Sequence, residues 1–406
     1  MSAEHGAQST QTSAIPQRLH AVDALRALAL LGILSVNIWF FAHPEMLLGV
    51  RGSAPESSAD QLVRFASSLI FEGKSYVVFS FLFGLSFVLA WARAYETGTS
   101  ETRRSARRCT ALMVLGVLHG LFLFAGDILL AYGILGFILL GLRRILAKAA
   151  LITAAVLYVA VVGLLLLVGL VSMSMEDSMG EMTEWIGDPE QAVQAYTGTV
   201  GEWFGFQAGV YPMVAFSLLL GQGPLALAAF LVGLVVGRAR MLERIAAGEF
   251  STARLLAIGV PALLLGLAVS ALAAVLVWGA PGSTRDTTGY GSDLLGTVLN
   301  LAAGPVQACG YVILLLLIFR STAPLTKALA PAGRMSLTNY LGQSVVMVII
   351  FAGIGFGLGG QLSEVTVGAV VLGIWVVQLL VSHLWFTRFR RGPLEAPFRA
   401  WTYAGR

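Results

Sequence analysis

The chain has 406 residues, of which 57% belong to the hydrophobic set and 12% are charged, about half the charged share that is usual in a soluble domain. A soluble fold needs a charged surface, so this composition excludes an ordinary soluble enzyme as well as a disordered chain. Apolar stretches of about 18 residues or more recur along the chain, which is the pattern of bilayer-spanning helices. The sequence therefore predicts an all-α polytopic transmembrane helix bundle.

The first 22 residues are polar and predict a cytoplasmic tail, and the apolar run after them is long enough to span a membrane and lacks the cleavage site of a signal peptide. We expect about ten spans, at Ala24–Phe41, Ser75–Ala94, Arg108–Phe124, Ile128–Leu142, Ala149–Val171, Met213–Gly237, Ala253–Trp278, Gly296–Phe319, Met335–Phe356 and Val365–Phe386. Only Ala125-Gly126-Asp127 separates the third from the fourth, so these two form a tight hairpin.

Lysine and arginine are distributed very unequally over the two predicted sides of the membrane. Twenty-two lie on the side of the N-terminus, and four lie on the other side, namely Arg51, Arg64, Lys74 and Arg285. The positive-inside rule then places both termini in the cytoplasm of a multi-pass protein of the cell (plasma) membrane. Because loop arginines account for the net charge of +4, we expect the lipid bilayer as a partner and no nucleic acid.

The chain thus divides into five parts. These are a cytoplasmic polar tail (1–22), an N-terminal membrane half of about five spans (23–171), an acidic outer loop (172–212), a C-terminal membrane half of about five spans (213–386) and a basic cytoplasmic tail (387–406). Each half has the length that five short-looped spans require. The oligomeric state stays open.

The outer loop contains no lysine or arginine and carries seven acids, Glu176, Asp177, Glu181, Glu184, Asp188, Glu190 and Glu202. Aromatic residues alternate with these acids, which predicts that the loop lies along the membrane interface; they are Trp185, Trp203, Phe204 and Phe206. Two interpretations remain open: a solvated segment that orients the chain, or a lid over a substrate.

No recognised catalytic or metal motif occurs in the sequence. Cys109 and Cys309 both lie in apolar segments without a second ligand at metal-binding spacing, so we expect them to pack and expect no metal site. There is no Walker loop, GxGxxG, HExxH or GxSxG pattern, and no firmly bound cofactor is predicted.

His119 and Asp127 are the first candidates for chemistry, because an ionisable group within hydrocarbon costs free energy and needs a reason. His119 lies eleven residues beyond Arg108, about 17 Å along a helix. A carboxylate beside a histidine fixes its tautomer for general-base catalysis. Eight residues are too many for contact within one helix, so either the turn at Gly126 folds Asp127 back or another helix intervenes. The alternative is a packing histidine beside the GxxxG pair Gly116 and Gly120.

Further candidates lie near the two predicted membrane surfaces. His43 ends the first span on the outer side and is either catalytic or interfacial. Asp23 and Arg26 are three residues apart on one helix face at the inner side, so they pair either with each other or with a ligand.

A second polar strip, at the start of the ninth span, comprises Arg334, Ser336, Asn339 and Gln343. It is either an inward-facing site for an anion such as a phosphate, or a snorkelling arginine with interhelical hydrogen bonds. Asn37 and Lys74 are candidates to line a path between the two ends, although a polar side chain within a bundle also serves to join helices.

Several segments resemble, in this order, the motifs of the YeiB-like membrane proteins, a domain-of-unknown-function family. They are RLHAVDALRALALLGILSVN (18–37), FSFLFG (79–84), LHGLFLFAGDIL (118–129), GRMSLTNYLGQS (333–344) and GPLE (392–395) with Arg399 and Thr402-Tyr403. The resemblance covers nearly the whole chain.

The opening Asp-x-x-Arg helix of that family is similar to that of membrane acyltransferases such as heparan-α-glucosaminide N-acetyltransferase. In that enzyme a histidine that follows the first helix on the outer side is implicated in the reaction, and His43 is placed comparably in this sequence. This wider resemblance implies transfer of an acyl group from cytoplasmic acyl-CoA, the donor substrate, to a glycan or lipid acceptor on the outer side. On this hypothesis Arg26 and Arg334 hold the donor, His119 or His43 is the general base, and Asp127 orients the histidine.

Two alternatives remain open. One is a transporter of a small metabolite or lipid, for which the interior polar groups and a weak similarity between residues 76–84 and 214–221 speak. The other is a structural or assembly protein without a site.

Overall fold

The computed structural model describes residues 14–49, 55–96, 100–174, 188–283 and 290–403. Among these residues every regular element is helical and no strand occurs, which confirms the predicted all-α bundle. Several residues named above lie outside this description: Arg51, Glu176, Asp177, Glu181, Glu184, Trp185 and Arg285, with most of the N-terminal tail.

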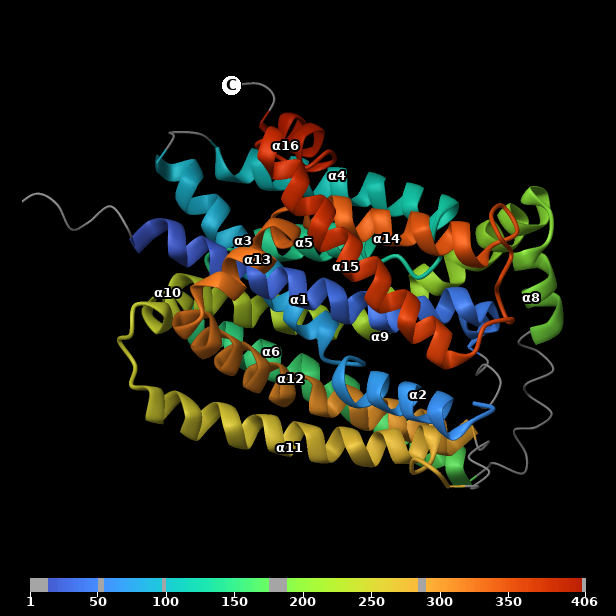
Figure 1. The fold of residues 1–406 in the computed structure, drawn as a ribbon. Helices are drawn as coiled ribbons and strands as arrows, with labels where there is room; N and C mark the ends of the chain where they lie inside the picture. The colour runs from blue at the N-terminus through green and yellow to red at the C-terminus, as the bar shows by residue number, and fades with distance from the viewer. Residues whose placement is uncertain (1–13, 50–54, 97–99, 175–187, 284–289, 404–406) are drawn as a thin grey trace, which may run out of the picture.

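The helices of the first half run back and forth along the bundle (Figure 1). They are α1 (Ala14–Ala42), the 3-10 helix η1 (Pro44–Leu48), α2 (Ser58–Ile70), α3 (Ser75–Glu96), α4 (Glu101–Phe122), α5 (Leu129–Gly141) and α6 (Ala147–Ser174). The second half comprises α8 (Pro189–Thr197), α9 (Val200–Arg238), α10 (Met241–Ala246), α11 (Thr252–Trp278), α12 (Tyr290–Ser321), α13 (Ala323–Arg334), α14 (Ser336–Phe351), α15 (Glu364–Arg388) and α16 (Glu395–Tyr403). We call the end that holds Arg26, Arg108 and Arg334 the basic end, and the end that holds His43 the opposite end.

Seven of the described helical stretches are long and apolar enough to cross a membrane, which supports a multi-pass membrane protein. They are His20–Ala42, Ser58–Trp91, Ala147–Ser174, Val200–Arg238, Thr252–Trp278, Gly291–Ser321 and Glu364–Arg388. Three of the ten predicted spans differ: α4 begins with a charged turn, while α5 and α14 have only 13 and 16 residues. At a rise of about 1.5 Å per residue, 13 residues cover about 20 Å, less than the ~30 Å of a hydrocarbon core.

The second predicted span is longer than expected and is interrupted. It begins with α2, and the helix breaks over residues 71–74 before α3 continues. The carbonyls at the break are satisfied from α12, because Gln307 donates to Leu69 O (3.0 Å) and Tyr311 to Ile70 O (3.0 Å). Irregular backbone at membrane depth is tolerated where protein satisfies it in this way.

Lys74 lies in this break, with none of its surface exposed, and Arg64 on α2 is only 3% exposed. The Lys74 Nζ donates to Ser68 O (2.9 Å) and to Asn300 Oδ1 (2.6 Å). The expectation that both cations belong to an outer loop is therefore corrected: they are buried in the bundle, where protein groups take the place of water.

The predicted outer loop is helical over most of its described part. A capping box between Thr199 and Glu202 starts α9, which has 39 residues, so the helix begins 13 residues before the expected Met213. Trp203 is 4% exposed and belongs to the core rather than to an interface, whereas Phe204 is 40% exposed. The early start of α9 has a local cause, because the capping box satisfies its first backbone N–H groups.

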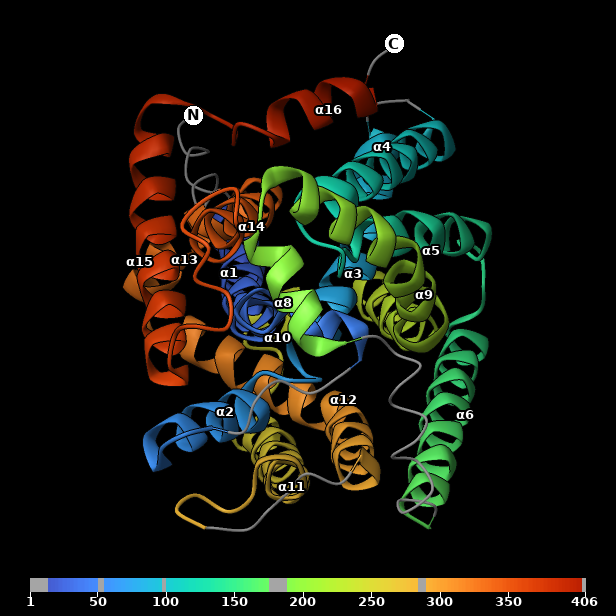
Figure 2. The ribbon, with the colours of Figure 1, turned by 90° about the vertical axis from the view of Figure 1, so that its right-hand side faces the viewer.

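α1 is the central helix (Figure 2). Two thirds of its span (67%) is buried, against 11% for the peripheral α6. Close approach at glycine joins α3 to α9, since a Cβ on Gly84 would overlap the backbone of Phe230, and one on Gly233 would overlap Phe81 O. This close contact explains why the FSFLFG segment ends in a glycine, Gly84.

Candidate functional site

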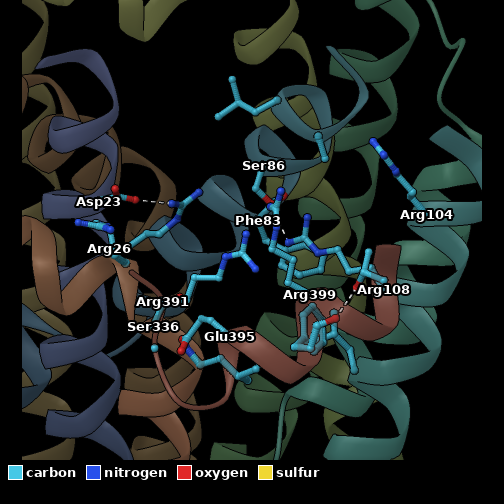
Figure 3. A pocket seen from close by; sticks show the side chains of 18 of the residues that line it. Asp23, Arg26, Phe83, Ser86, Arg104, Arg108, Ser336, Arg391, Glu395 and Arg399 are labelled. Atoms are coloured by element: carbon cyan, nitrogen blue, oxygen red, sulfur yellow. Dashed lines mark hydrogen bonds and ion pairs between the residues drawn. The ribbon is translucent and has the colours of Figure 1, made fainter. Parts of the chain in front are cut away.

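A cavity of about 610 Å³ opens at the basic end between α1, α3, α4, α5 and the segment from α13 to α16. Seven arginines line it against three carboxylates, Asp23, Glu101 and Glu395; the arginines are Arg26, Arg104, Arg108, Arg334, Arg390, Arg391 and Arg399. Figure 3 shows Arg26, Arg108, Arg391 and Arg399 converging from different elements. The cavity lining therefore carries an excess of positive charge.

Aromatic rings and hydroxyls hold several of these arginines in place. Arg108 donates to Ser86 Oγ (2.8 Å) and lies over the Phe83 ring at 4.8 Å. Arg334 lies over the Phe386 ring at 4.0 Å. Stacking on these rings orients the two guanidinium groups in the cavity lining.

The predicted Asp23–Arg26 pair is present, with 2.6 Å between Asp23 Oδ1 and Arg26 Nη1. Arg334 is brought to it by Gly333, since a Cβ on that glycine would overlap Asp23 O, and no larger residue would allow α13 to approach α1 so closely. Two separate motifs of the sequence thus meet at one wall of the cavity.

Glu395 explains the closing GPLE segment. Its carboxylate accepts hydrogen bonds from Leu337 N (2.8 Å), Thr338 N (3.0 Å) and Thr338 Oγ1 (2.6 Å), which caps the N-terminus of α14. The cap ties α16 and the preceding turn to the bundle. Arg391 and Arg399 of that region are thereby held at the cavity.

His119 and Asp127 are in direct contact. The turn after α4 folds Asp127 back, so that its Oδ1 lies 2.8 Å from His119 Nδ1, while Oδ2 accepts from Leu130 N (2.9 Å). Gly116 makes room, because a Cβ there would lie 2.6 Å from Asp127 Oδ2. Of the two arrangements left open by the sequence, the structure has the folded-back turn.

Ser344 completes this group and was missed by the sequence reasoning. Its hydroxyl lies 2.8 Å from His119 Nε2, and the exposed fractions of Asp127, His119 and Ser344 are 2%, 2% and 1%. When the ring is neutral, a carboxylate on Nδ1 selects the Nδ1–H tautomer, and the Ser344 hydroxyl then donates to Nε2. The only sequence signal was its place at the end of the polar strip on α14, one residue beyond Gln343.

The cavity and this buried group are adjacent. Leu112, Leu129, Tyr132 and Tyr340 form an apolar and aromatic part of the cavity lining. The Tyr340 ring lies 5.1 Å from the His119 ring, between centroids, and Tyr340 is only 4% exposed. Tyr340 therefore lies between the arginine-lined cavity and the histidine–carboxylate pair.

His43 belongs to a different buried cluster, at the opposite end. Its Nε2 lies 3.2 Å from Glu364 Oε2 and its Nδ1 lies 3.5 Å from Glu45 Oε1. Burial lowers the pKa of His43, but the hydrogen bonds to Glu364 and Glu45 outweigh it and raise the pKa above 6.5. Arg64 is packed between the Trp39 and Trp278 rings, at 4.1 and 4.0 Å, and lies 4.0 Å from Glu364. His43 is thus remote from the cavity lining.

The other predicted binding residues do not line the cavity. Asn339 donates to Ala332 O (2.9 Å) and Gln343 to Gln378 Oε1 (2.9 Å), which joins α13, α14 and α15. Asn37 is half-buried on α1, and Lys74 lies in the helix break. Ser336 does line the cavity, so only the start of the polar strip faces the site.

Within the described ranges, no three His, Cys, Asp or Glu side chains are grouped so that they could hold a metal ion.

The chain is similar to three proteins over nearly its whole length. It is 30% identical to the uncharacterised protein YeiB of Escherichia coli over 396 residues, which cover 95% of this chain and 96% of YeiB. It is 28% identical to the uncharacterised protein YxaH of Bacillus subtilis over 418 residues, with 97% and 96% covered. An uncharacterised 39.9 kDa protein in the amylase 3' region of Bacillus acidopullulyticus is 28% identical over 401 residues, with 96% and 95% covered. The model of a family described as protein of unknown function (DUF418) matches residues 236–405.

Proposed function

The chain belongs to the YeiB-like family, in which the DUF418 region forms the C-terminal part, and we propose that it is an acyltransferase. It moves an acyl group from acyl-CoA, bound at the basic end, to a hydroxyl or amine of a glycan or lipid acceptor reached from the opposite end. One observation carries the proposal: the arginine-rich cavity is also lined by Tyr340, whose ring packs against a histidine bonded to a carboxylate.

The cavity suits a donor with several phosphates. A volume of about 610 Å³ lies within the ~300–1,000 Å³ of small-molecule sites, and planar guanidinium groups bind phosphate through two N–H groups at once. The apolar surface that Leu112, Leu129 and Tyr340 contribute to the lining fits the uncharged acyl end of the same molecule. The polarity of the cavity thus matches the donor from its charged end to its acyl end.

His119 supplies the base. Asp127 holds the Nδ1–H tautomer, so that Nε2 accepts a proton from the attacking hydroxyl or amine. Burial of the pair excludes water, which would otherwise hydrolyse the thioester. Positioned proton transfer of this kind contributes about 10²–10⁴-fold to a rate, which sets the loss we expect for His119→Gln.

The first test uses purified protein in vesicles made from bacterial envelope lipids, with radiolabelled acetyl-CoA on one side. We expect label in a lipid or glycan product, with transfer lost in His119→Gln and Asp127→Asn. If no lipid or glycan acquires label, or if His119→Gln transfers at the full rate, the proposal is wrong.

A second test separates binding from chemistry. Loss of an arginine–phosphate contact costs about 1.5–3 kcal/mol, so Arg391→Gln and Arg399→Gln should each weaken coenzyme A binding about 10- to 100-fold in calorimetry. Arg244→Gln is the matched control, since Arg244 forms an exposed pair with Glu249 and does not line the cavity. Equal affinities for all three variants would contradict the assignment of the cavity to the donor.

Transport of a small metabolite or lipid is the second candidate, and the broken helix between α2 and α3 favours it. Interrupted helices with buried ionisable groups, such as Lys74, are common at transporter substrate sites. Solute accumulation in the same vesicles without covalent change of any component would support transport over acyl transfer.

A further inference from the structure

Three buried side chains from distant segments lie in one hydrogen-bonded row. Asp127 Oδ1 is 2.8 Å from His119 Nδ1, and His119 Nε2 is 2.8 Å from Ser344 Oγ. A carboxylate on one ring nitrogen and a hydroxyl on the other is the arrangement that activates serine as a nucleophile, and it is recognised by geometry rather than by sequence order. The proposed acyl transfer does not by itself require the serine.

We propose that Ser344 accepts the acyl group itself, so that the transfer proceeds in two steps through an acyl ester on this serine. The inference rests on the proposed acyl transfer and specifies its route. In the first step Ser344 Oγ attacks the thioester carbonyl carbon and its proton passes to His119 Nε2. The carbon–sulfur bond then breaks, and the departing thiolate of coenzyme A takes the proton from Nε2.

The second step reverses these roles. A hydroxyl or amine of the acceptor attacks the ester carbonyl and gives its proton to His119 Nε2. The bond between the carbonyl carbon and Ser344 Oγ breaks, and Oγ recovers the proton from Nε2. The net change is one thioester and one acceptor converted into one free thiol and one acylated acceptor, with no other reactant.

The position of Ser344 gives this route a physical advantage. It lies eight residues beyond Ser336, which lines the cavity, and this corresponds to about 12 Å along α14. A donor held by its phosphates at the arginines stays at the basic end, because charged groups are costly within the bundle. An acyl ester carries no charge, so it can be held at a site that is 1% exposed.

Tyr340 controls access in this arrangement. It precedes Ser344 by one helical turn, so both side chains lie on the same face of α14, and Tyr340 lines the cavity whereas Ser344 does not. The Tyr340 side chain must therefore turn aside before the acyl carbon reaches Oγ. Its buried O–H group is then a donor for the oxygen of the tetrahedral intermediate.

A serine that merely joins two helices is the competing explanation. Ser270 is such a case, because it is fully buried and donates to Gln307 Oε1 (2.9 Å) on the next helix. Ser344 differs in its partner, since His119 is itself held by a carboxylate and can accept the hydroxyl proton. Ser270 therefore provides the matched control.

The experiment incubates the full-length protein with radiolabelled acetyl-CoA or palmitoyl-CoA and no acceptor, followed by intact-mass measurement and peptide mapping. We expect up to one acyl group per chain on the peptide that contains Ser344, lost in Ser344→Ala and retained in Ser270→Ala. Ser344→Cys gives a chemical signature, because its thioester is released by neutral hydroxylamine whereas the wild-type ester resists it.

Three results would overturn the inference. If the wild type transfers label to an acceptor but never carries it, or if Ser344→Ala transfers at the full rate, transfer is direct and only the serine intermediate is wrong. If the label resides on another residue, Ser344 is not the carrier. If neither donor gives labelled protein or labelled acceptor, the proposed acyl transfer fails together with this inference.

Discussion

Replacement of Glu395 by alanine tests whether the C-terminal helix builds the cavity. The carboxylate accepts three hydrogen bonds, two of them from backbone N–H groups at the start of α14. In Glu395→Ala these two N–H groups lose their acceptors, and the tie between α16 and α14 is lost. We therefore expect both a less stable protein and a weaker donor site.

The magnitude follows from known caps. Loss of a helix N-cap lowers the free energy of unfolding by about 0.5–2 kcal/mol, and a hydrogen bond to a charged group contributes about 1.5–3 kcal/mol when it is shielded from water. Glu395 is half-buried, so water partly replaces it, and we expect a total loss of about 1–2 kcal/mol. A displaced α16 also takes Arg399 from the cavity, which predicts coenzyme A binding about tenfold weaker, equivalent to about 1.4 kcal/mol.

The assay is thermal unfolding of the detergent-solubilised protein, paired with calorimetric binding of coenzyme A. Glu395→Gln keeps one acceptor oxygen and should lose less than the alanine variant. Glu249→Ala is the control, because Glu249 pairs with Arg244 on the exposed surface. If Glu395→Ala unfolds at the wild-type temperature and binds equally well, the cap does not hold the cavity together and the reasoning is refuted.

Three further outcomes are expected. Gly116→Ala forces the histidine–carboxylate pair apart and should abolish transfer, whereas Gly163→Ala, with no atom near its added carbon, should leave it intact; equal activities would contradict the close contact. Lys74→Met leaves two buried acceptors without a donor and should lower the free energy of unfolding by about 1–3 kcal/mol, and an unchanged denaturation midpoint would argue against this contribution. Burial lowers the pKa of His43, but hydrogen bonds to Glu364 and a second carboxylate raise it above 6.5. The interaction of His43 with Glu364 therefore stabilises the fold fully below about pH 6.5, and this stabilisation is lost as the pH rises through the raised pKa of His43. His43→Gln should remove this pH dependence when the free energy of unfolding is measured across pH 6–9.

The helices themselves were predictable because hydrophobicity is a local property of the chain. Runs such as Ala24–Phe41 and Ala149–Val171 can satisfy their backbone groups in lipid only as helices, so composition and length indicate the elements without reference to partners. The exceptions are the places where tertiary contacts replace lipid. The break at residues 71–74 is stable because Gln307 and Tyr311 reach its carbonyls from α12.

The site was predictable only where sequence neighbours meet. Asp23 and Arg26 pair across one turn, and Asp127 reaches His119 through one short loop. Asn339 and Gln343 have the same spacing as pocket-lining residues, yet they join helices, because spacing along a helix does not reveal what packs against each face.

The sequence by itself determined that the chain forms a helical membrane bundle, and it identified His119 and Asp127 among the ionisable groups that the bundle buries. The tertiary structure alone decided that Ser344 meets His119 across 225 residues, and that seven arginines from five different segments enclose one cavity. The reason is physical, because helix formation depends on hydrogen bonds between residues four apart in the sequence. A site depends instead on how whole helices pack. That packing is specified by glycine contacts and helix caps, such as Gly333 and Glu395, which join segments far apart in the chain.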